Sequence, residues 1–120
     1  MNDQPEWKIR LGHELATADQ ARDRGNEGMA RVCARRAAGV VIAEYLRQAG
    51  LQARKPSAIE QLRMFAALPE ESLPQVNEKA RTIAGHFLLH LDQEHHLPVD
   101  ADLVAEARWL AEWLLNFKAE

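Results

Sequence analysis

The sequence predicts an all-α protein, an antiparallel four-helix up-down bundle with one extra short helix. Apolar residues recur at helical spacing in four long segments, and brief turn-forming stretches separate these segments. Strands are not expected, because the chain has few β-branched runs and no strict alternation of apolar and polar residues. Its 120 residues predict a single domain, residues 1–120, with a core of its own. Long amphipathic helices joined by short connections favour antiparallel neighbours.

The first predicted helix runs from about Pro5 to Arg24, since proline suits a first turn and the stretch RGNEG is a stop. Its apolar stripe consists of Trp7, Leu11, Leu15 and Ala18. The second predicted helix runs from about Met29 to Gln48, and Gly50 is the expected stop. Its middle, AAGVVIA, is apolar on every side, which indicates a central position in the fold. The small residues that would let a neighbouring helix approach closely are Ala37, Ala38 and Gly39.

The extra short helix is predicted from about Ala58 to Ala67, because Ser57 and Glu60 have the spacing of a capping box at its start. The third long helix is expected from about Pro74 to Gln93. The last helix is expected from about Ala101 to Phe117, with Asp100 as its N-cap. The residues around which we expect the helices to pack are Val40, Ile83, Phe87 and Leu110.

Charge and cysteine content narrow the classes of function. The formal net charge is −3, so any contact with nucleic acid must come from a local basic patch. Cys33 is the only cysteine, which excludes an intrachain disulfide and is typical of a reducing compartment. Its place on the most apolar helix favours a small core residue over a nucleophile. The N-terminus lacks an apolar signal core and AAGVVIA is too short for a bilayer, so we expect a cytoplasmic protein with no membrane partner.

Arg81 and His86 lie in the stretch KARTIAGHFLLHLD of the third long helix. Five steps place them about 140° apart around a straight helix, on opposite flanks of its apolar stripe. The spacing alone therefore favours two boundary residues that bury their stems and keep their polar tips in water. A shared site would require a bend at Gly85, or a second copy of the chain that brings the two flanks together.

His86 and His90 are four residues apart and share a face of the predicted helix, so they could chelate a metal. Further candidate ligands follow at Glu94, His95 and His96. The pair lacks the glutamate of an H-E-x-x-H motif, and the chain has no cysteine cluster. Solvated or hydrogen-bonded histidines are therefore favoured, and we predict no metal ligand and no cofactor.

Basic residues gather around the first turn and the start of the second helix, at Arg22, Arg24, Arg31, Arg35 and Arg36. Such a patch could hold phosphates, or it could be a solvated face opposite the acidic residues nearby, which is somewhat favoured. The candidate substrate-binding residues are Arg31, Arg35 and Arg36.

Trp109 and Trp113 are four residues apart and lie about 80–100° from the core stripe of the last helix. This ridge could complete the core of one chain, or it could form half of a dimer contact, because tryptophan is enriched at interface hot spots. We predict a homodimer, since a two-fold interface could also bring Arg81 of one copy close to His86 of the other copy.

The helix pattern resembles the HEPN superfamily, small α-helical proteins named for higher eukaryotes and prokaryotes nucleotide-binding. The likeness rests on the early Trp7, the helix ARVCARRAAGVVIAEYLRQAG, a short helix after it, and R-x4-H from Arg81 to His86. It covers most of the chain as a helix pattern. The chain departs from the family at Thr82, where Asn, Asp or His is usual, and at Phe87, since a common toxin form has tyrosine two places after the histidine.

The resemblance implies a metal-independent endoribonuclease of toxin–antitoxin type, or a partner of a minimal nucleotidyltransferase, that dimerises with two motifs facing one cleft. Arg81 would bind the scissile phosphate. His86 would move protons to and from the ribose 2′-hydroxyl and the leaving oxygen. Two alternatives stay open, namely a non-catalytic module that binds a nucleotide or a protein, and a metal-binding bundle that uses His86 and His90.

Overall fold

The chain is all-α in the computed structural model, which describes residues 4–51, 57–69, 71, 76–89, 97 and 99–118. Within these residues there are five helices and no strand, so the all-α part of the predicted fold class is confirmed. None of these helices combines the length and the apolar character that crossing a bilayer requires. The helices are α1 (Glu6–Asp23), α2 (Glu27–Gln48), α3 (Ala58–Ala67), α4 (Glu78–Phe87) and α5 (Leu103–Leu115).

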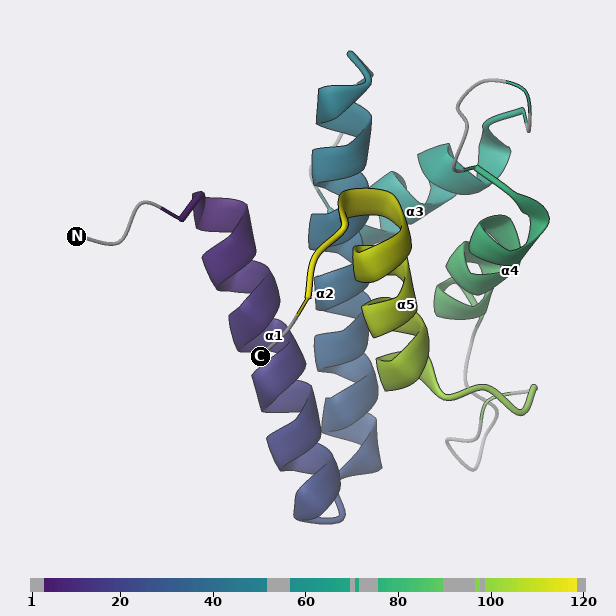
Figure 1. Ribbon diagram of the computed structural model, residues 1–120. Helices are drawn as coiled ribbons and strands as arrows, with labels where there is room; N and C mark the ends of the chain where they lie inside the picture. The colour runs from purple at the N-terminus through teal and green to yellow at the C-terminus, as the bar shows by residue number, and fades with distance from the viewer. Residues whose placement is uncertain are drawn as a thin grey trace.

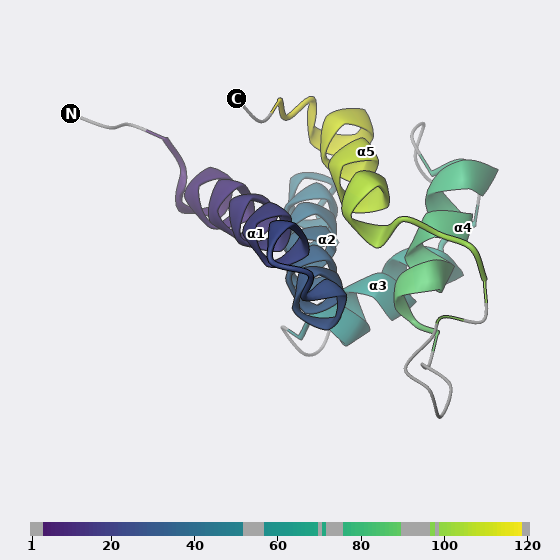
Figure 2. The ribbon, with the colours of Figure 1, turned by 90° about the horizontal axis from the view of Figure 1, so that it is seen from below.

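Helix α2 is the centre of the fold and packs against α1, α3 and α5 (Figure 1). α1 and α2 form an antiparallel pair, whereas α5 lies beside α2 and runs in the same general direction. α3 leads away from α2 to α4, and α4 also contacts α5. Figure 2 shows α1 and α4 on opposite sides of the α2–α5 pair. The up-down order of a four-helix bundle stays a prediction.

The ends of α1 and α2 follow local capping chemistry. α1 begins directly after Pro5 and ends one residue before Arg24, as predicted to within a residue. α2 begins at Glu27, two residues earlier than predicted, because the Asn26 side chain accepts a hydrogen bond of 3.0 Å from the Met29 N–H. Gly50 has a φ of 78° after the end of α2, which is the left-handed conformation that glycine favours at a helix stop.

Helix α3 approaches α2 closely because position 39 has no side chain. α3 spans the predicted residues, and the Ser57 hydroxyl accepts a hydrogen bond of 3.2 Å from the Glu60 N–H at its start. A Cβ placed on Gly39 would lie 2.6 Å from the Ala58 Cβ and 2.9 Å from its Cα. The expected close approach of a neighbouring helix is therefore confirmed at Gly39, and α3 starts there.

Gly39→Ala should lower the free energy of unfolding by about 1–2 kcal/mol. Overpacking typically costs about 1–3 kcal/mol, and the gain in helix propensity from glycine to alanine offsets up to about 1 kcal/mol of it. Gly12→Ala is the matched control, since a Cβ at Gly12 would meet no atom of the described residues within 4 Å. It should raise stability by about 0.5–1 kcal/mol. Urea unfolding measures both changes, and equal effects at the two glycines would contradict the packing described here.

The described part of the third long helix is shorter than predicted. α4 begins at Glu78, because the Asn77 side chain accepts a hydrogen bond of 2.8 Å from the Ala80 N–H. Val76 is buried although it precedes the helix. The predicted start at Pro74 and the predicted end at Gln93 lie outside the described residues.

The predicted N-cap of the last helix is wrong. α5 begins at Leu103, and the Asp102 carboxylate, not that of Asp100, caps it by accepting a hydrogen bond of 3.1 Å from the Ala105 N–H. Arg22 Nη1 donates to the same Asp102 oxygen at 3.0 Å, which holds the carboxylate in place. Burial alone would raise the pKa of Asp102, but these hydrogen bonds and the charge of Arg22 lower it on balance.

Arg22 fixes the start of α5 against the turn between α1 and α2. Its guanidinium also donates to both oxygens of Glu27, at 2.9 and 2.7 Å. This bidentate hydrogen bond with Arg22 lowers the pKa of Glu27, against the opposing effect of burial. A second link joins α5 to α1, since the Arg108 guanidinium pairs with the Asp19 carboxylate. α5 therefore has a fixed position on the α1–α2 pair.

The core contains the residues that the sequence predicted. Val40, Ile83, Phe87 and Leu110 are all buried and belong to one continuous apolar cluster. Phe87 is completely inaccessible to solvent, although it is next to His86 in the chain. The buried face of α4 therefore fixes the direction in which its neighbouring polar residues point.

Candidate functional site

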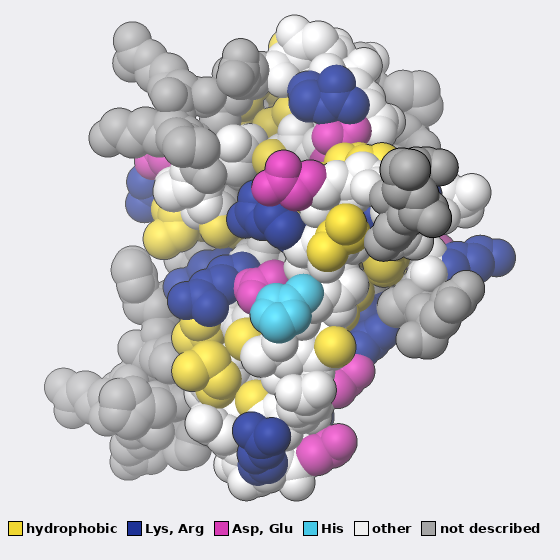
Figure 3. All heavy atoms as spheres, turned by 90° about the vertical axis from the view of Figure 1, so that its left-hand side faces the viewer, with side chains coloured by type: hydrophobic (Ala, Val, Ile, Leu, Met, Phe, Trp, Pro, Cys, Tyr) yellow, Lys and Arg dark blue, Asp and Glu magenta, His cyan; other side chains and the backbone are white. Residues whose placement is uncertain are grey.

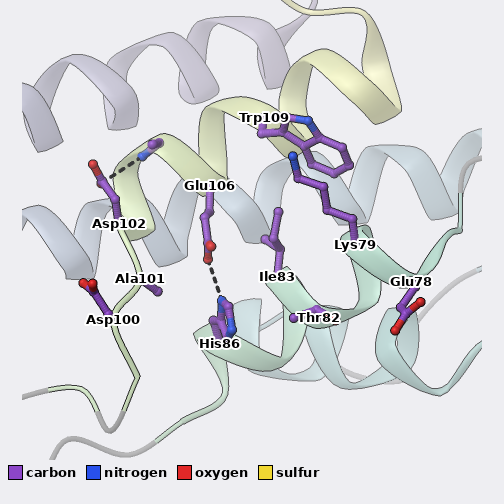
Figure 4. Close-up of a pocket in the computed structure, with 11 residues that line it drawn as sticks. Glu78, Lys79, Thr82, Ile83, His86, Asp100, Ala101, Asp102, Glu106 and Trp109 are labelled. Carbon is purple, nitrogen blue, oxygen red and sulfur yellow. Dashed lines mark hydrogen bonds and ion pairs between the residues drawn. The ribbon is translucent and has the colours of Figure 1, made fainter.

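A groove of about 690 Å³ lies between α4 and the start of α5, and we name it the α4–α5 groove (Figure 4). Residues of α4 form one wall, including Lys79, Ile83 and His86. The opposite wall comes from the approach to α5 and from its first turns. Its residues include Asp100, Asp102, Glu106 and Trp109. The groove lies within the usual size range of small-molecule sites.

His86 is joined to Glu106 across this groove, with 2.8 Å between Nδ1 and Oε1 (Figure 4). The two side chains are 23% and 21% exposed, so they are shielded from water without being sealed from it. An ionised carboxylate only accepts, and therefore Nδ1 carries the hydrogen of this bond. The arrangement fixes the orientation and the tautomer of the ring and leaves Nε2 to exchange a proton.

Glu106 is a site residue that the sequence did not predict. It lies 20 residues after His86, on a different helix, and nothing in the local sequence distinguishes it from the other glutamates of the chain. Only the packing of α4 against α5 brings the two side chains together.

Arg81 does not line the α4–α5 groove. It borders a smaller hollow with Ala66, Glu78 and Thr82, and its Nη2 is 3.5 Å from the Ala66 carbonyl oxygen. Glu78 and Thr82 line both hollows, so the two lie next to each other on α4. Within one chain, Arg81 and His86 therefore face different hollows, in agreement with the angle expected from their spacing.

The three candidate substrate-binding arginines have separate environments, and none lines the α4–α5 groove. Arg31 Nε lies 4.0 Å from the Glu27 carboxylate. Arg35 Nε donates a hydrogen bond of 3.1 Å to the Phe87 carbonyl, which belongs to the last residue of α4. Arg36 is exposed and lines a different pocket, between α1 and α2.

The two tryptophans of α5 stack, with ring centroids 5.6 Å apart and planes inclined by 15°. Trp109 packs against the core, and Lys79 Nζ lies 4.4 Å from its ring centroid. Trp113 is 41% exposed. Trp109 thus completes the core, whereas Trp113 presents an apolar surface. The predicted dimer contact through it stays a prediction.

No metal cluster is present in the part of the chain that the structure describes, where no three His, Cys, Asp or Glu side chains are grouped to hold an ion. His90, Glu94, His95 and His96, which the metal alternative requires, lie outside these residues. Cys33 is buried in the core, as expected for a packing residue. Burial, with a contribution from the charge of Glu14, raises the pKa of its thiol.

Comparison of the chain with protein-family models, with curated proteins and with solved structures finds no match. The groove, its His86–Glu106 pair and the placement of the arginines are therefore the observations that bear on function.

Proposed function

We propose that this chain is a HEPN-like domain, with a four-helix up-down arrangement and one added short helix, that acts in the cytoplasm as a metal-independent endoribonuclease. Its setting is a toxin–antitoxin pair or a partnership with a minimal nucleotidyltransferase. The observation that supports the activity most is the hydrogen bond between His86 and Glu106 at the α4–α5 groove. A histidine oriented by a carboxylate is suited to general acid–base catalysis.

The proposed reaction uses the RNA's own 2′-hydroxyl as the nucleophile. His86 Nε2 accepts the proton of this hydroxyl, O2′ attacks the adjacent phosphorus, and the bond from phosphorus to the leaving O5′ breaks. His86 then returns this proton to O5′, which completes the step and yields a 2′,3′-cyclic phosphate and a 5′-hydroxyl. The Arg81 guanidinium stabilises the charge that develops on the phosphate oxygens. The reaction requires neither a metal ion nor a covalent enzyme intermediate.

A homodimer is part of the proposal, because Arg81 and His86 face different hollows of α4 within one chain. In a two-fold dimer, Arg81 of one copy can meet His86 of the other, and the same pairing then occurs twice. The exposed Trp113, stacked on Trp109, is the candidate contact because a large apolar side chain on the surface is typical of interfaces.

A second candidate function, a non-catalytic module that binds a protein, is favoured by the charge of the groove. Four carboxylates of the described part of the chain line it, at Glu78, Asp100, Asp102 and Glu106. Among the described residues, Lys79 and His86 are the basic residues in the same lining. Such a surface attracts a basic segment of a protein more readily than a polyanion. In this case the purified protein should bind its partner and cleave no RNA.

Glu106→Gln should lower kcat for RNA cleavage by on the order of 10- to 100-fold and leave KM nearly unchanged. The amide can no longer hold the His86 ring as an ionised acceptor does, and misplacement of a catalytic group by about 1 Å costs rate on this scale. The assay uses single-stranded RNA in excess chelator. Glu112→Gln, an exposed glutamate on the same helix, is the matched control and should retain full activity. Equal kcat values for wild type and Glu106→Gln would remove the proposed role of this pair.

A further inference from the structure

A second pocket, of about 370 Å³, lies where α1, α2 and the first residue of α3 meet, and we name it the α1–α2 pocket. Its polar lining comes from Arg10, His13 and Glu14 of α1 and from Arg36 of α2. Figure 3 looks onto the α1 side of the molecule and shows a histidine beside carboxylate and basic side chains. None of the described residues of this pocket lines the α4–α5 groove.

The packing of the three helices builds the pocket. Gly39 and Ala58 are both part of its lining, and their close approach brings the start of α3 to its floor. The N-terminal end of a helix carries a partial positive charge, which adds to that of the nearby arginines. Arg10 and Glu14 are one helical turn apart on α1, so their side chains point to the same side.

The pocket brings two guanidinium groups next to a carboxylate that has one unsatisfied oxygen. Within the described part of the chain, the guanidinium groups of Arg10 and Arg36 have no hydrogen-bond or ion-pair partner. Glu14 Oε2 is buried, and no described residue donates a hydrogen bond to it. An unsatisfied buried acceptor is costly, and a ligand that donates to it removes this cost.

We propose that the α1–α2 pocket binds a small phosphate monoester that carries a hydroxyl or amino group near its phosphate. The planar guanidinium groups of Arg10 and Arg36 match the geometry of phosphate oxygens. Glu14 is an acceptor and selects a ligand that also donates. The volume is at the low end for ligand sites, which favours a small molecule over a polymer. This binding goes beyond the proposed RNA cleavage and does not depend on it.

Isothermal titration of the full chain with inorganic phosphate and with ribose 5-phosphate tests the proposal. Both should bind saturably, and ribose 5-phosphate should bind more tightly because it can donate to Glu14. Arg10→Gln and Arg36→Gln should each weaken both ligands by on the order of 10-fold, as expected for the loss of a charged hydrogen bond. Arg24→Gln, an exposed arginine of the α1–α2 turn, is the matched control and should bind as wild type.

Glu14→Leu tests whether the Glu14 carboxylate accepts a hydrogen bond from the bound ligand. It removes the carboxylate, so inorganic phosphate should bind at least as tightly, while the preference for ribose 5-phosphate should disappear. Absence of saturable binding by both ligands at millimolar concentration would overturn the proposal. Equal weakening by Arg24→Gln would overturn it as well. His86→Ala should leave this binding unchanged, so a failure here is distinct from a failure of the proposed cleavage activity.

Discussion

His86→Ala and Arg81→Ala should each lower the rate of RNA cleavage by on the order of 10²–10⁴-fold in excess chelator. General acid–base catalysis contributes on this scale, and replacement of the imidazole removes the group that transfers the proton. The arginine variant loses the charge that stabilises the phosphate in the transition state, which is a large effect in a partly shielded site. Rates are measured on single-stranded RNA between about pH 6 and pH 8, around the ordinary pKa of histidine.

Both variants should stay folded, because Arg81 and His86 are half-buried at the edge of α4 and do not fill the core. Circular dichroism and urea unfolding confirm this before rates are compared. The matched controls are His13→Ala, an exposed histidine of α1, and Arg63→Ala, an exposed arginine of α3. Substituted proteins that cut as well as wild type would place the activity at another site or in a contaminant. A wild type that cuts nothing across this pH range would favour the binding module.

The helices could be predicted because their signals are local in the sequence. Residues of α3 show this most clearly, since the predicted range Ala58 to Ala67 is confirmed and the Ser57 hydroxyl caps it. Apolar spacing also identified the core, as the burial of Phe87 and Leu110 shows. Such signals need no knowledge of which helices become neighbours.

The errors in the predicted helix boundaries arose where two local capping signals compete, or where a residue distant in the sequence determines which one is used. Asp100 and Asp102 are equally good N-caps by sequence, but only Asp102 also accepts a hydrogen bond from Arg22, 80 residues away. The start of α4 was placed too early because Val76 fits the apolar pattern, although Asn77 is the residue that caps the helix. Periodicity locates a buried residue without telling whether it lies inside the helix.

The candidate site was predicted only in part. The spacing of Arg81 and His86 predicted that they would not converge in one chain, and the structure places them in different hollows. Glu106 could not be predicted, because its contact with His86 depends on how α4 and α5 pack. The arginines of α2 were grouped by sequence, yet tertiary contacts divide them. Arg35 binds the end of α4, and Arg36 lines the α1–α2 pocket.

The measurement that tests the central claim most directly is RNA cleavage by a mixture of the Arg81→Ala and His86→Ala proteins, coexpressed so that their subunits assort freely. About half of the dimers then contain one copy of each variant, and each of these has one intact pairing of Arg81 with the other copy's His86. We predict that each variant alone is inactive, that sedimentation gives the mass of two chains, and that the mixture regains about a quarter of wild-type activity. A mixture that stays inactive while wild type cleaves RNA would contradict a site shared between two copies.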